Sequence, residues 1–166
     1  MGERMPQPAD PAEAVIAELT RRGLRIAVAE SLTGGLVMAE LTRIPGASVV
    51  VNGGVVAYDT DVKRSLLGVS AGLLEREGAV HPEVARQMAD RVRHVLAVDG
   101  RPADLGIATT GVAGPTDQDG KPAGTVYLGV AIGDDVEAIA LDLHGDRAEI
   151  RAATVRAAIG ALLERL

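Results

Sequence analysis

The sequence of 166 residues contains no cysteine. This absence excludes disulfides, thiolate catalysis and zinc sites with cysteine ligands, and it gives no redox indication of the compartment. No apolar run is long enough to span a bilayer, and no basic start followed by an apolar stretch indicates a signal peptide. We therefore expect a soluble, cytoplasmic protein with no membrane partner.

Aromatic residues are almost absent, since Tyr58 and Tyr127 are the only two. The core must therefore be aliphatic, and stacking platforms for nucleic-acid bases are missing. The formal net charge of −6 also argues against a general nucleic-acid binder, which needs a basic surface. We expect no nucleic-acid partner.

Lysine is scarce as well: of 17 basic residues, only Lys63 and Lys121 are lysines. Arginine cannot act as a base, whereas a buried lysine can lose its proton near neutral pH. Lys63 is therefore a candidate for a role that needs an amine. The alternative is that two lysines remained by drift.

Hydrophobic periodicity and turn signals divide the chain into a loose tail (1–10) and one domain (11–166). Pro11 and Gly23 delimit the first helix, and glycines 53 and 54 predict a bulge or close approach within a strand. The order of elements predicts a three-layer α/β/α sandwich with a mixed, mostly parallel five-stranded sheet. Helices are expected over 11–22, 35–44, 60–67, 71–77, 82–98 and from 147 onward, and strands over 24–29, 49–58, 104–109, 124–132 and 136–143.

The segment from Glu30 to Gly35 (ESLTGG) follows the first strand and precedes a helix. This order places the Ser31 hydroxyl near backbone N–H groups that could stabilise an oxyanion. Ser31 is therefore a candidate nucleophile, and the alternative is that Ser31 or Thr33 only caps the helix. Glu30 could orient Lys63 or support the helix entry.

A serine nucleophile needs a base, and the three histidines are poor candidates. His94 falls on the polar face of the 82–98 helix, His81 precedes a helix, and His144 is expected at the surface. No two histidines have the helix spacing of metal ligands, so we expect no metal site. Lys63 remains as the base, with Tyr58 between or beside the two; the alternative for Tyr58 is core packing.

A long glycine-rich loop (111–123) follows the strand over 104–109, at a position where α/β sheets commonly bind ligands. Thr110, Gly111 and Gly114 are candidates for substrate contact, and the alternative is that the glycines only make turns. Arg147 lies at the start of the last helix, which is unfavourable for the helix dipole and suggests a use as an anion ligand or simply an exposed position.

Several of these segments together resemble the CinA C-terminal domain family. The resemblance rests on AESLTGG (29–35), GGVVAYDTDVK (53–63), LGV (67–69), GAV (78–80), TGVAGP (110–115) and KPAGTVY (121–127). It covers nearly the whole chain, from about residue 12 to 163, in the same order. The sequence departs from the family pattern at Leu32, where cysteine is frequent, and at residues 116–120, where TDQDG replaces a glycine-richer stretch.

The resemblance implies a nicotinamide-nucleotide amidase, which hydrolyses nicotinamide mononucleotide to nicotinic acid mononucleotide and ammonia without a cofactor. It implies catalytic roles for Ser31, Tyr58 and Lys63 and a homo-oligomer, dimeric or larger. The expected contacts to the mononucleotide are Glu30, Thr33, Gly34, Gly35, Thr110, Gly111, Gly114 and Arg147. Two alternatives remain: a non-catalytic nucleotide-binding or interaction domain, and an amidase or esterase for another small carboxamide.

Overall fold

The computed structural model describes residues 10–166. Its helices are α1 (Pro11–Arg22), α2 (Leu36–Thr42), α3 (Thr60–Ser65), α4 (Ala71–Glu77), α5 (Pro82–Val95) and α6 (Arg147–Arg165), with a 3₁₀ turn η1 (Ala47–Val49). Its strands are β1 (Ile26–Glu30), β2 (Val51–Val56), β3 (Leu105–Gly111), β4 (Thr125–Ile132) and β5 (Asp135–Asp142). The predicted tail over residues 1–9 lies outside the described residues.

The five strands form one sheet in the order β2-β1-β3-β4-β5. β1 pairs in parallel with β2 and β3, whereas β4 is antiparallel to both β3 and β5. Four strands therefore run in one direction and β4 alone runs against them. This confirms the mixed, mostly parallel sheet.

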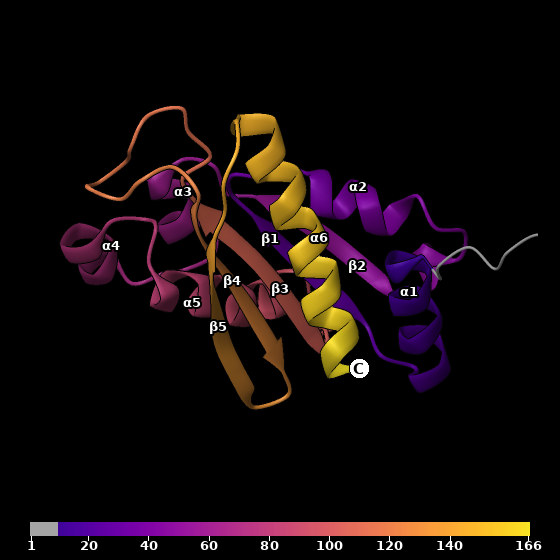
Figure 1. Cartoon of the computed structure of the whole chain (residues 1–166). Coiled ribbons are helices and arrows are strands. Elements are labelled where there is room, and N and C mark those ends of the chain that lie inside the picture. Colours follow the sequence, from indigo (N-terminus) through magenta and orange to yellow (C-terminus); the bar gives the residue numbers. More distant parts are fainter. Residues whose placement is uncertain (1–9) are drawn as a thin grey trace, which may run out of the picture.

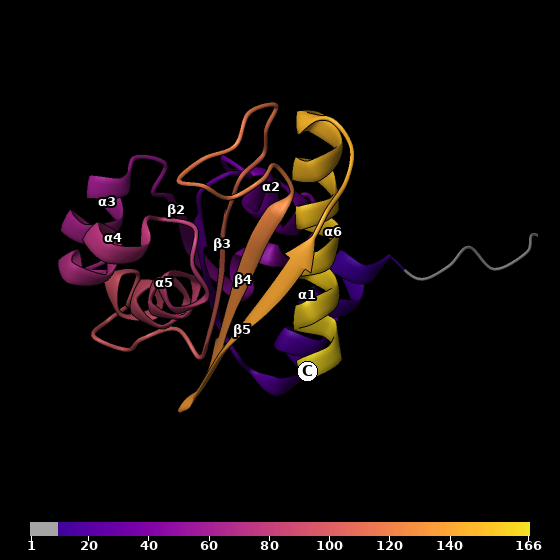
Figure 2. The same cartoon turned by 60° about the vertical axis from the view of Figure 1, so that its left-hand side comes forward.

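Helices cover both faces of the sheet, as Figure 2 shows, with α3, α4 and α5 on one side and α1, α2 and α6 on the other. The sheet has a hydrophobic core on each face, and alternating residues of β1 contribute to the two cores. Ile26 and Val28 pack toward α1, α2 and α6, while Ala27 and Ala29 pack toward α5. Both faces of β1 are thus buried, and the three-layer sandwich is confirmed.

Glycines let α5 lie unusually close to the sheet. A Cβ atom added to Gly106 of β3 or Gly129 of β4 would collide with backbone carbonyls of α5, those of Ala89 and Ala85. The larger aliphatic side chains of the strands lie mainly on the opposite face of the sheet. The predicted irregularity at glycines 53 and 54 is also present, because the β1–β2 register shifts beside Asn52.

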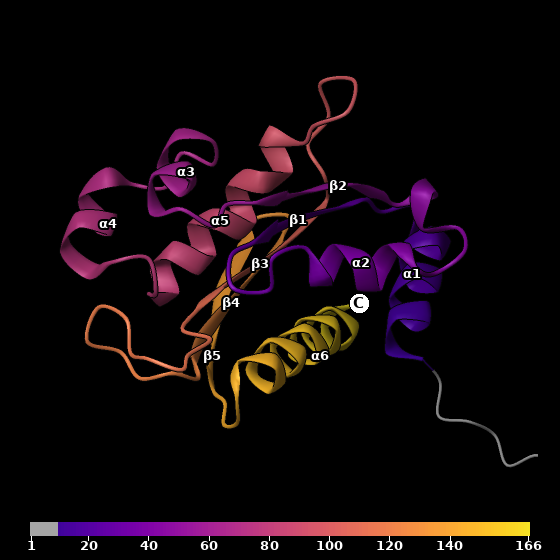
Figure 3. The same ribbon diagram turned by 90° about the horizontal axis from the view of Figure 1, so that it is seen from above.

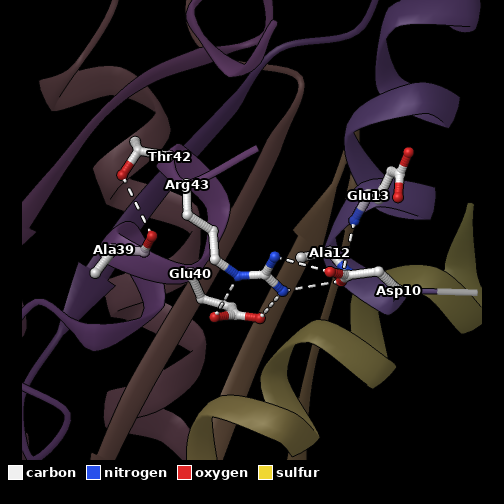
Figure 4. A network of polar contacts seen from close by, with 7 residues as sticks. All are labelled: Asp10, Ala12, Glu13, Ala39, Glu40, Thr42 and Arg43. Atoms are coloured by element: carbon white, nitrogen blue, oxygen red, sulfur yellow. Dashed lines mark hydrogen bonds and ion pairs between the residues drawn. The ribbon is translucent and has the colours of Figure 1, made fainter. Parts of the chain in front are cut away.

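The helix ends follow their capping signals. Asp10 accepts hydrogen bonds from the N–H groups of Ala12 and Glu13, and Gly23 ends α1 with a φ of 65°. Figure 4 shows that Asp10 also contacts Arg43, which follows α2 and pairs with Glu40, so one guanidinium joins the ends of two helices. The helix predicted over 82–98 ends earlier, at Val95. Among residues 10–166, no helix is long and apolar enough to cross a membrane.

Candidate active site

The carboxyl ends of β1 and β3 carry the residues with functional signals. Ser31 follows β1 directly, and the 112–124 loop follows β3. The start of α6 and helix α3 lie at this same end of the molecule, at the top of Figure 1. Seen from above in Figure 3, the 112–124 loop reaches out beside α4 and away from α6.

A cavity of about 510 Å³ opens at this end of the sheet. Its walls come from five segments: the turn after β1, residues 58–63 at the start of α3, residues 79–80, the end of β3 with the glycine-rich loop, and the start of α6. The lining residues are Ser31, Leu32, Tyr58, Asp59, Thr60, Lys63, Ala79, Val80, Thr110, Gly111, Val112, Ala113, Gly114, Thr116, Asp117, Gln118 and Arg147. Three distant sequence signals, Ser31, Lys63 and Arg147, therefore meet in one cavity.

Lys63 and Ser31 are in direct contact. The Lys63 Nζ atom lies 3.0 Å from Ser31 Oγ, 2.7 Å from the Ala57 carbonyl oxygen and 3.3 Å from that of Tyr58. Only 1% of Lys63 is exposed, and Ser31 is also buried. A neutral amine in this position donates its two N–H groups to the carbonyls and turns its lone pair to the serine hydroxyl. The arrangement suits a base that accepts the Ser31 proton.

Burial also favours the neutral form of the Lys63 amine. Desolvation lowers the pKa of its ammonium group to about 8, while the nearby Asp59 carboxylate opposes the change. In the described part of the chain, no carboxylate forms an ion pair with Lys63. With this pKa, roughly a tenth of the amine is neutral at pH 7, far more than for an ordinary lysine, and the neutral form is the one that general-base catalysis requires.

The turn after β1 differs from the predicted helix start. α2 begins only at Leu36, with Gly35 as its N-cap and no side-chain cap, so neither Ser31 nor Thr33 caps it. The buried carboxylate of Glu30 instead accepts the N–H groups of Val37 and Met38, at 2.8 and 3.1 Å. Glu30 is fully buried, stabilises the helix entry and is not among the residues that line the cavity.

Three further predicted substrate contacts lie outside the cavity. The Thr33 hydroxyl is buried and lies 2.8 Å from that of Thr109, while Gly34 and Gly35 supply the positive φ angles of the turn, 57° and 106°. The Gly34 N–H donates to the Ser31 carbonyl at 3.1 Å, so it does not face a substrate. The Thr33 side chain and the two glycines therefore shape the turn that carries Ser31, and none of the three residues is among those that line the cavity.

Tyr58 and Arg147 meet at the rim of the cavity. The Arg147 guanidinium donates to the Tyr58 hydroxyl at 3.0 Å and to the Gly114 carbonyl at 2.8 Å. Tyr58 is 60% exposed, so the alternative of core packing is wrong. Its hydroxyl contacts Arg147, whereas its carbonyl contacts Lys63, and so the phenol does not lie between Ser31 and Lys63.

The far wall contains the predicted contacts Thr110, Gly111 and Gly114. It also contains Ala79 and Val80, which carry no signal of a binding site in the sequence, because no local pattern brings the segment between α4 and α5 to the cavity. The Thr110 hydroxyl donates to the Ala79 carbonyl at 2.7 Å, and the Lys121 ammonium group donates to the carbonyls of Glu77 and Val80. Both contacts fasten this segment to the cavity wall.

The histidines lie away from the nucleophile. His81 accepts the Glu83 N–H at its Nδ1 atom and caps α5, while His94 and His144 are exposed. Within residues 10–166, no group of histidine, aspartate and glutamate side chains is arranged to hold a metal ion.

Comparison with known proteins places this architecture in a family. The profile of the CinA C-terminal domain matches residues 9–166. A competence-damage inducible protein of Geobacillus kaustophilus is 48% identical over 152 residues, which are 91% of this chain and 36% of the relative. A CinA-like protein of Frankia casuarinae is 47% identical over 145 residues, 87% of this chain and 32% of the relative. The chain thus spans about a third of the length of the curated relatives it matches.

Solved structures match over nearly their whole length. The competence/damage inducible protein CihA from Agrobacterium tumefaciens is 36% identical with a TM-score of 0.84, and the match covers 97% of this chain and 98% of that one. A CinA superfamily protein from Enterobacter cloacae is 28% identical with a TM-score of 0.89, over 99% and 98% of the two chains. From the profile match and these structures, we conclude that the chain belongs to the CinA C-terminal domain family.

Proposed function

We propose that this domain is a nicotinamide-nucleotide amidase that uses Ser31 as nucleophile and Lys63 as base. The observation that carries the proposal is the buried Lys63 Nζ, 3.0 Å from Ser31 Oγ at the wall of an open cavity. The resemblance of the sequence motifs to the amidases of the family supplies the substrate, nicotinamide mononucleotide.

Acylation begins when Ser31 Oγ attacks the carboxamide carbon of the substrate. Lys63 Nζ takes the serine proton, since its two carbonyl contacts leave the lone pair directed at the hydroxyl. The protonated Lys63 then gives this proton to the amide nitrogen, the C–N bond breaks, and ammonia leaves. The product of this half-reaction is a nicotinoyl ester of Ser31.

The tetrahedral intermediate carries a negative oxygen, which needs hydrogen-bond donors. In the described residues, the N–H groups of Leu32 and Thr33 have no acceptor, and Leu32 lines the cavity beside Ser31. We assign the oxyanion to this pair. The Gly34 N–H, expected to help, is already bonded to the Ser31 carbonyl.

Deacylation repeats the same proton path with water. Neutral Lys63 removes a proton from a water molecule that attacks the ester carbon, and the Ser31 alkoxide leaves with the proton from Lys63. Nicotinic acid mononucleotide is released. Every step uses side chains and backbone groups of this chain.

The phosphate of the substrate needs a cation, and Arg147 is the guanidinium that lines the cavity. Among residues 10–166, its partners are a carbonyl and a phenol rather than a carboxylate, so its charge stays available to an anion. A guanidinium can bind a phosphate through two parallel hydrogen bonds. We propose Arg147 as the phosphate ligand at the rim.

The test is the release of ammonia and nicotinic acid mononucleotide from nicotinamide mononucleotide by the wild type, with Ser31→Ala and Lys63→Arg alongside. We expect turnover by the wild type and none by either variant, because the guanidinium that replaces the Lys63 amine cannot lose its proton. Circular dichroism and thermal unfolding check that the variants fold.

A folded wild type without turnover would reject the amidase. Calorimetric titration with the same nucleotide then asks whether the domain is a nucleotide-binding module. Turnover of free nicotinamide at the rate of the mononucleotide would instead indicate an amidase for another small carboxamide, because the phosphate contact to Arg147 would have no effect.

A further inference from the structure

Arg151, in the second turn of α6, lies behind the turn that carries Ser31. Its Nε donates to the Leu32 carbonyl at 2.9 Å, and its Nη2 donates to the Thr33 carbonyl at 3.3 Å. The side chain is half-buried, and within the described residues it has no carboxylate partner. A half-buried guanidinium without an acid partner carries a desolvation cost that a surface position would avoid.

The contacts of Arg151 complete a frame around the turn. The Ser31 N–H donates to the carbonyl and the hydroxyl of Thr109, at 3.0 and 3.3 Å. The Ser31 carbonyl accepts the N–H of Gly34. Since Arg151 holds the carbonyls of Leu32 and Thr33, every carbonyl from residue 31 to 33 accepts a hydrogen bond. The N–H groups of Leu32 and Thr33, in contrast, have no acceptor in the part of the chain that the structure describes.

Peptide geometry links the two sides of the turn. The peptide bond between Leu32 and Thr33 is trans. In a trans peptide the carbonyl and the N–H point in opposite directions. When Arg151 holds the Leu32 carbonyl, it therefore also fixes the direction of the Thr33 N–H, and its charge polarises the peptide so that this N–H becomes a stronger donor.

We propose that Arg151 is a positioning residue for acyl transfer, holding the Leu32 and Thr33 carbonyls so that the N–H groups of the turn are set for the oxyanion. This inference rests on the proposed function for its reaction, but not on the identity of the substrate. Arg151 touches no reacting atom. It acts through the backbone on the step in which negative charge develops, so its loss should affect kcat and not substrate binding.

Steady-state kinetics with nicotinamide mononucleotide provide the first test. We expect Arg151→Met to lower kcat about ten- to hundredfold and to change KM less than about twofold, because removal of an oxyanion donor costs about 10² to 10³ in kcat and here the donors are only loosened. Arg151→Lys keeps the positive charge but loses the paired N–H donors of the guanidinium, so its kcat should lie between those of Arg151→Met and the wild type. Arg156→Met, an exposed arginine of the same helix, is the matched control and should leave kcat unchanged.

Chemical rescue separates positioning from a general loss of structure. Methylguanidinium added to Arg151→Ala at roughly tens of millimolar should raise kcat at least about threefold, because it can bridge the same two carbonyls. Added to Arg156→Ala, it should have no effect. If Arg151→Met does not fold, the Lys variant and the rescue still decide the question.

A fluorophosphonate probe makes the test independent of the substrate. Ser31 Oγ forms a bond to phosphorus, the P–F bond breaks, fluoride leaves, and Lys63 takes the serine proton. Intact mass then reports the rate of labelling. We expect Arg151→Met to be labelled at least about tenfold more slowly than the wild type and the Arg156→Met control, because the phosphonyl oxygen occupies the same donors.

The outcomes distinguish the two proposals. A wild type that is labelled but does not hydrolyse the mononucleotide, with slow labelling of Arg151→Met, rejects the proposed substrate and supports the role of Arg151. Labelling and kcat of Arg151→Met within about threefold of the wild type overturn that role, as does a change in KM alone. A folded wild type that neither hydrolyses nor is labelled overturns both.

Discussion

The two lysines of the chain occupy similar polar settings with different consequences. Lys63 and Lys121 each donate to two backbone carbonyls, those of residues 57 and 58 and those of residues 77 and 80. Lys63 is buried and also contacts the hydroxyl of Ser31, whereas Lys121 is only partly buried and its contacts in the described residues are to carbonyls.

The difference shows what converts a structural lysine into a candidate base. Two carbonyl contacts alone are satisfied by an ammonium ion, which has three donors. Burial opposes the charge, and a hydroxyl in the third position can accept a hydrogen bond from the amine or donate its proton to it. Lys63 has both features, so we expect it to act in chemistry while Lys121 fastens a wall of the cavity.

The largest contrast should come from removing each amine. We expect Lys63→Met to lower kcat for ammonia release by at least about 10³, because the Ser31 proton loses its acceptor, a loss at the level of general-base catalysis or beyond. Lys121→Met should retain most of kcat. Equal losses in the two variants, in enzymes with unchanged thermal unfolding, would remove the distinction between the two lysines.

Burial of Lys63 should also appear in stability. Its pKa is about 8 in the folded chain and about 10.5 when unfolded, so the unfolded chain binds more protons between these values. The contribution of Lys63 to the free energy of unfolding should therefore be most favourable above pH 10.5 and become less favourable as the pH drops toward 8, by up to about 3 kcal/mol. Urea unfolding of the wild type and of Lys63→Met at each pH gives the difference between their free energies of unfolding. A difference that does not change between pH 8 and 10.5 would show that the Lys63 amine is exposed to water.

The same titration should control the rate. Because the neutral amine is the base, kcat/KM should rise about tenfold per pH unit below the Lys63 pKa and level off above about pH 8. The pH profile of the wild type tests this, with Lys121→Met as the control that should keep the same inflection. An inflection near pH 10.5 would place Lys63 in water in the working enzyme.

Loss of the Lys121 contacts should be smaller and of another kind. The wall formed by Ala79 and Val80 would lose two carbonyl contacts, so we expect stability to fall by about 1–2 kcal/mol and KM to rise severalfold, with kcat within about twofold. Lys121→Arg should recover part of the binding. A fall in kcat with unchanged KM would contradict a role confined to the wall.

The smallest effect is expected at Tyr58. Its hydroxyl contacts Arg147 and not Lys63 Nζ, so Tyr58→Phe should keep kcat within about threefold and raise KM by a similar factor, at the level of one lost hydrogen bond. Steady-state kinetics of this variant against Arg147→Lys provide the comparison. A loss of more than about a hundredfold in kcat would place the phenol in the proton path, as the family resemblance alone suggested.

The sequence predicted the elements well where local signals were strong. Asp10 and Gly23 delimit α1, and Asp146 caps α6 through a full capping box with Glu149. The turn after β1 was harder to predict, because serine and threonine near a helix suggest caps. Here the buried Glu30 carboxylate took that role, from a position before the turn.

The sequence predicted the part of the candidate site that has local signals. Three residues carry distinctive signals and line the cavity. Ser31 lies in a turn after a strand, Lys63 is one of only two lysines, and Arg147 is a cation at a helix N-terminus, where the helix dipole disfavours it. Arg151 is one of fifteen arginines and carries no signal of its own. Its contact with Leu32 spans 119 residues of sequence, which no local pattern can reveal.

The sequence by itself determined the family, the order of the elements, the aliphatic character of the core and the identity of the two candidate catalytic groups. The family follows from the resemblance of several motifs, and the other features follow from residue types and spacing, which act over a few residues. Only the tertiary structure decided how deeply Lys63 is buried, which N–H groups beside Ser31 remain without an acceptor among the described residues, and that Arg151 supports their turn. Such properties depend on which distant segments exclude water from a group or supply its hydrogen-bond partners, and packing of the whole fold sets them.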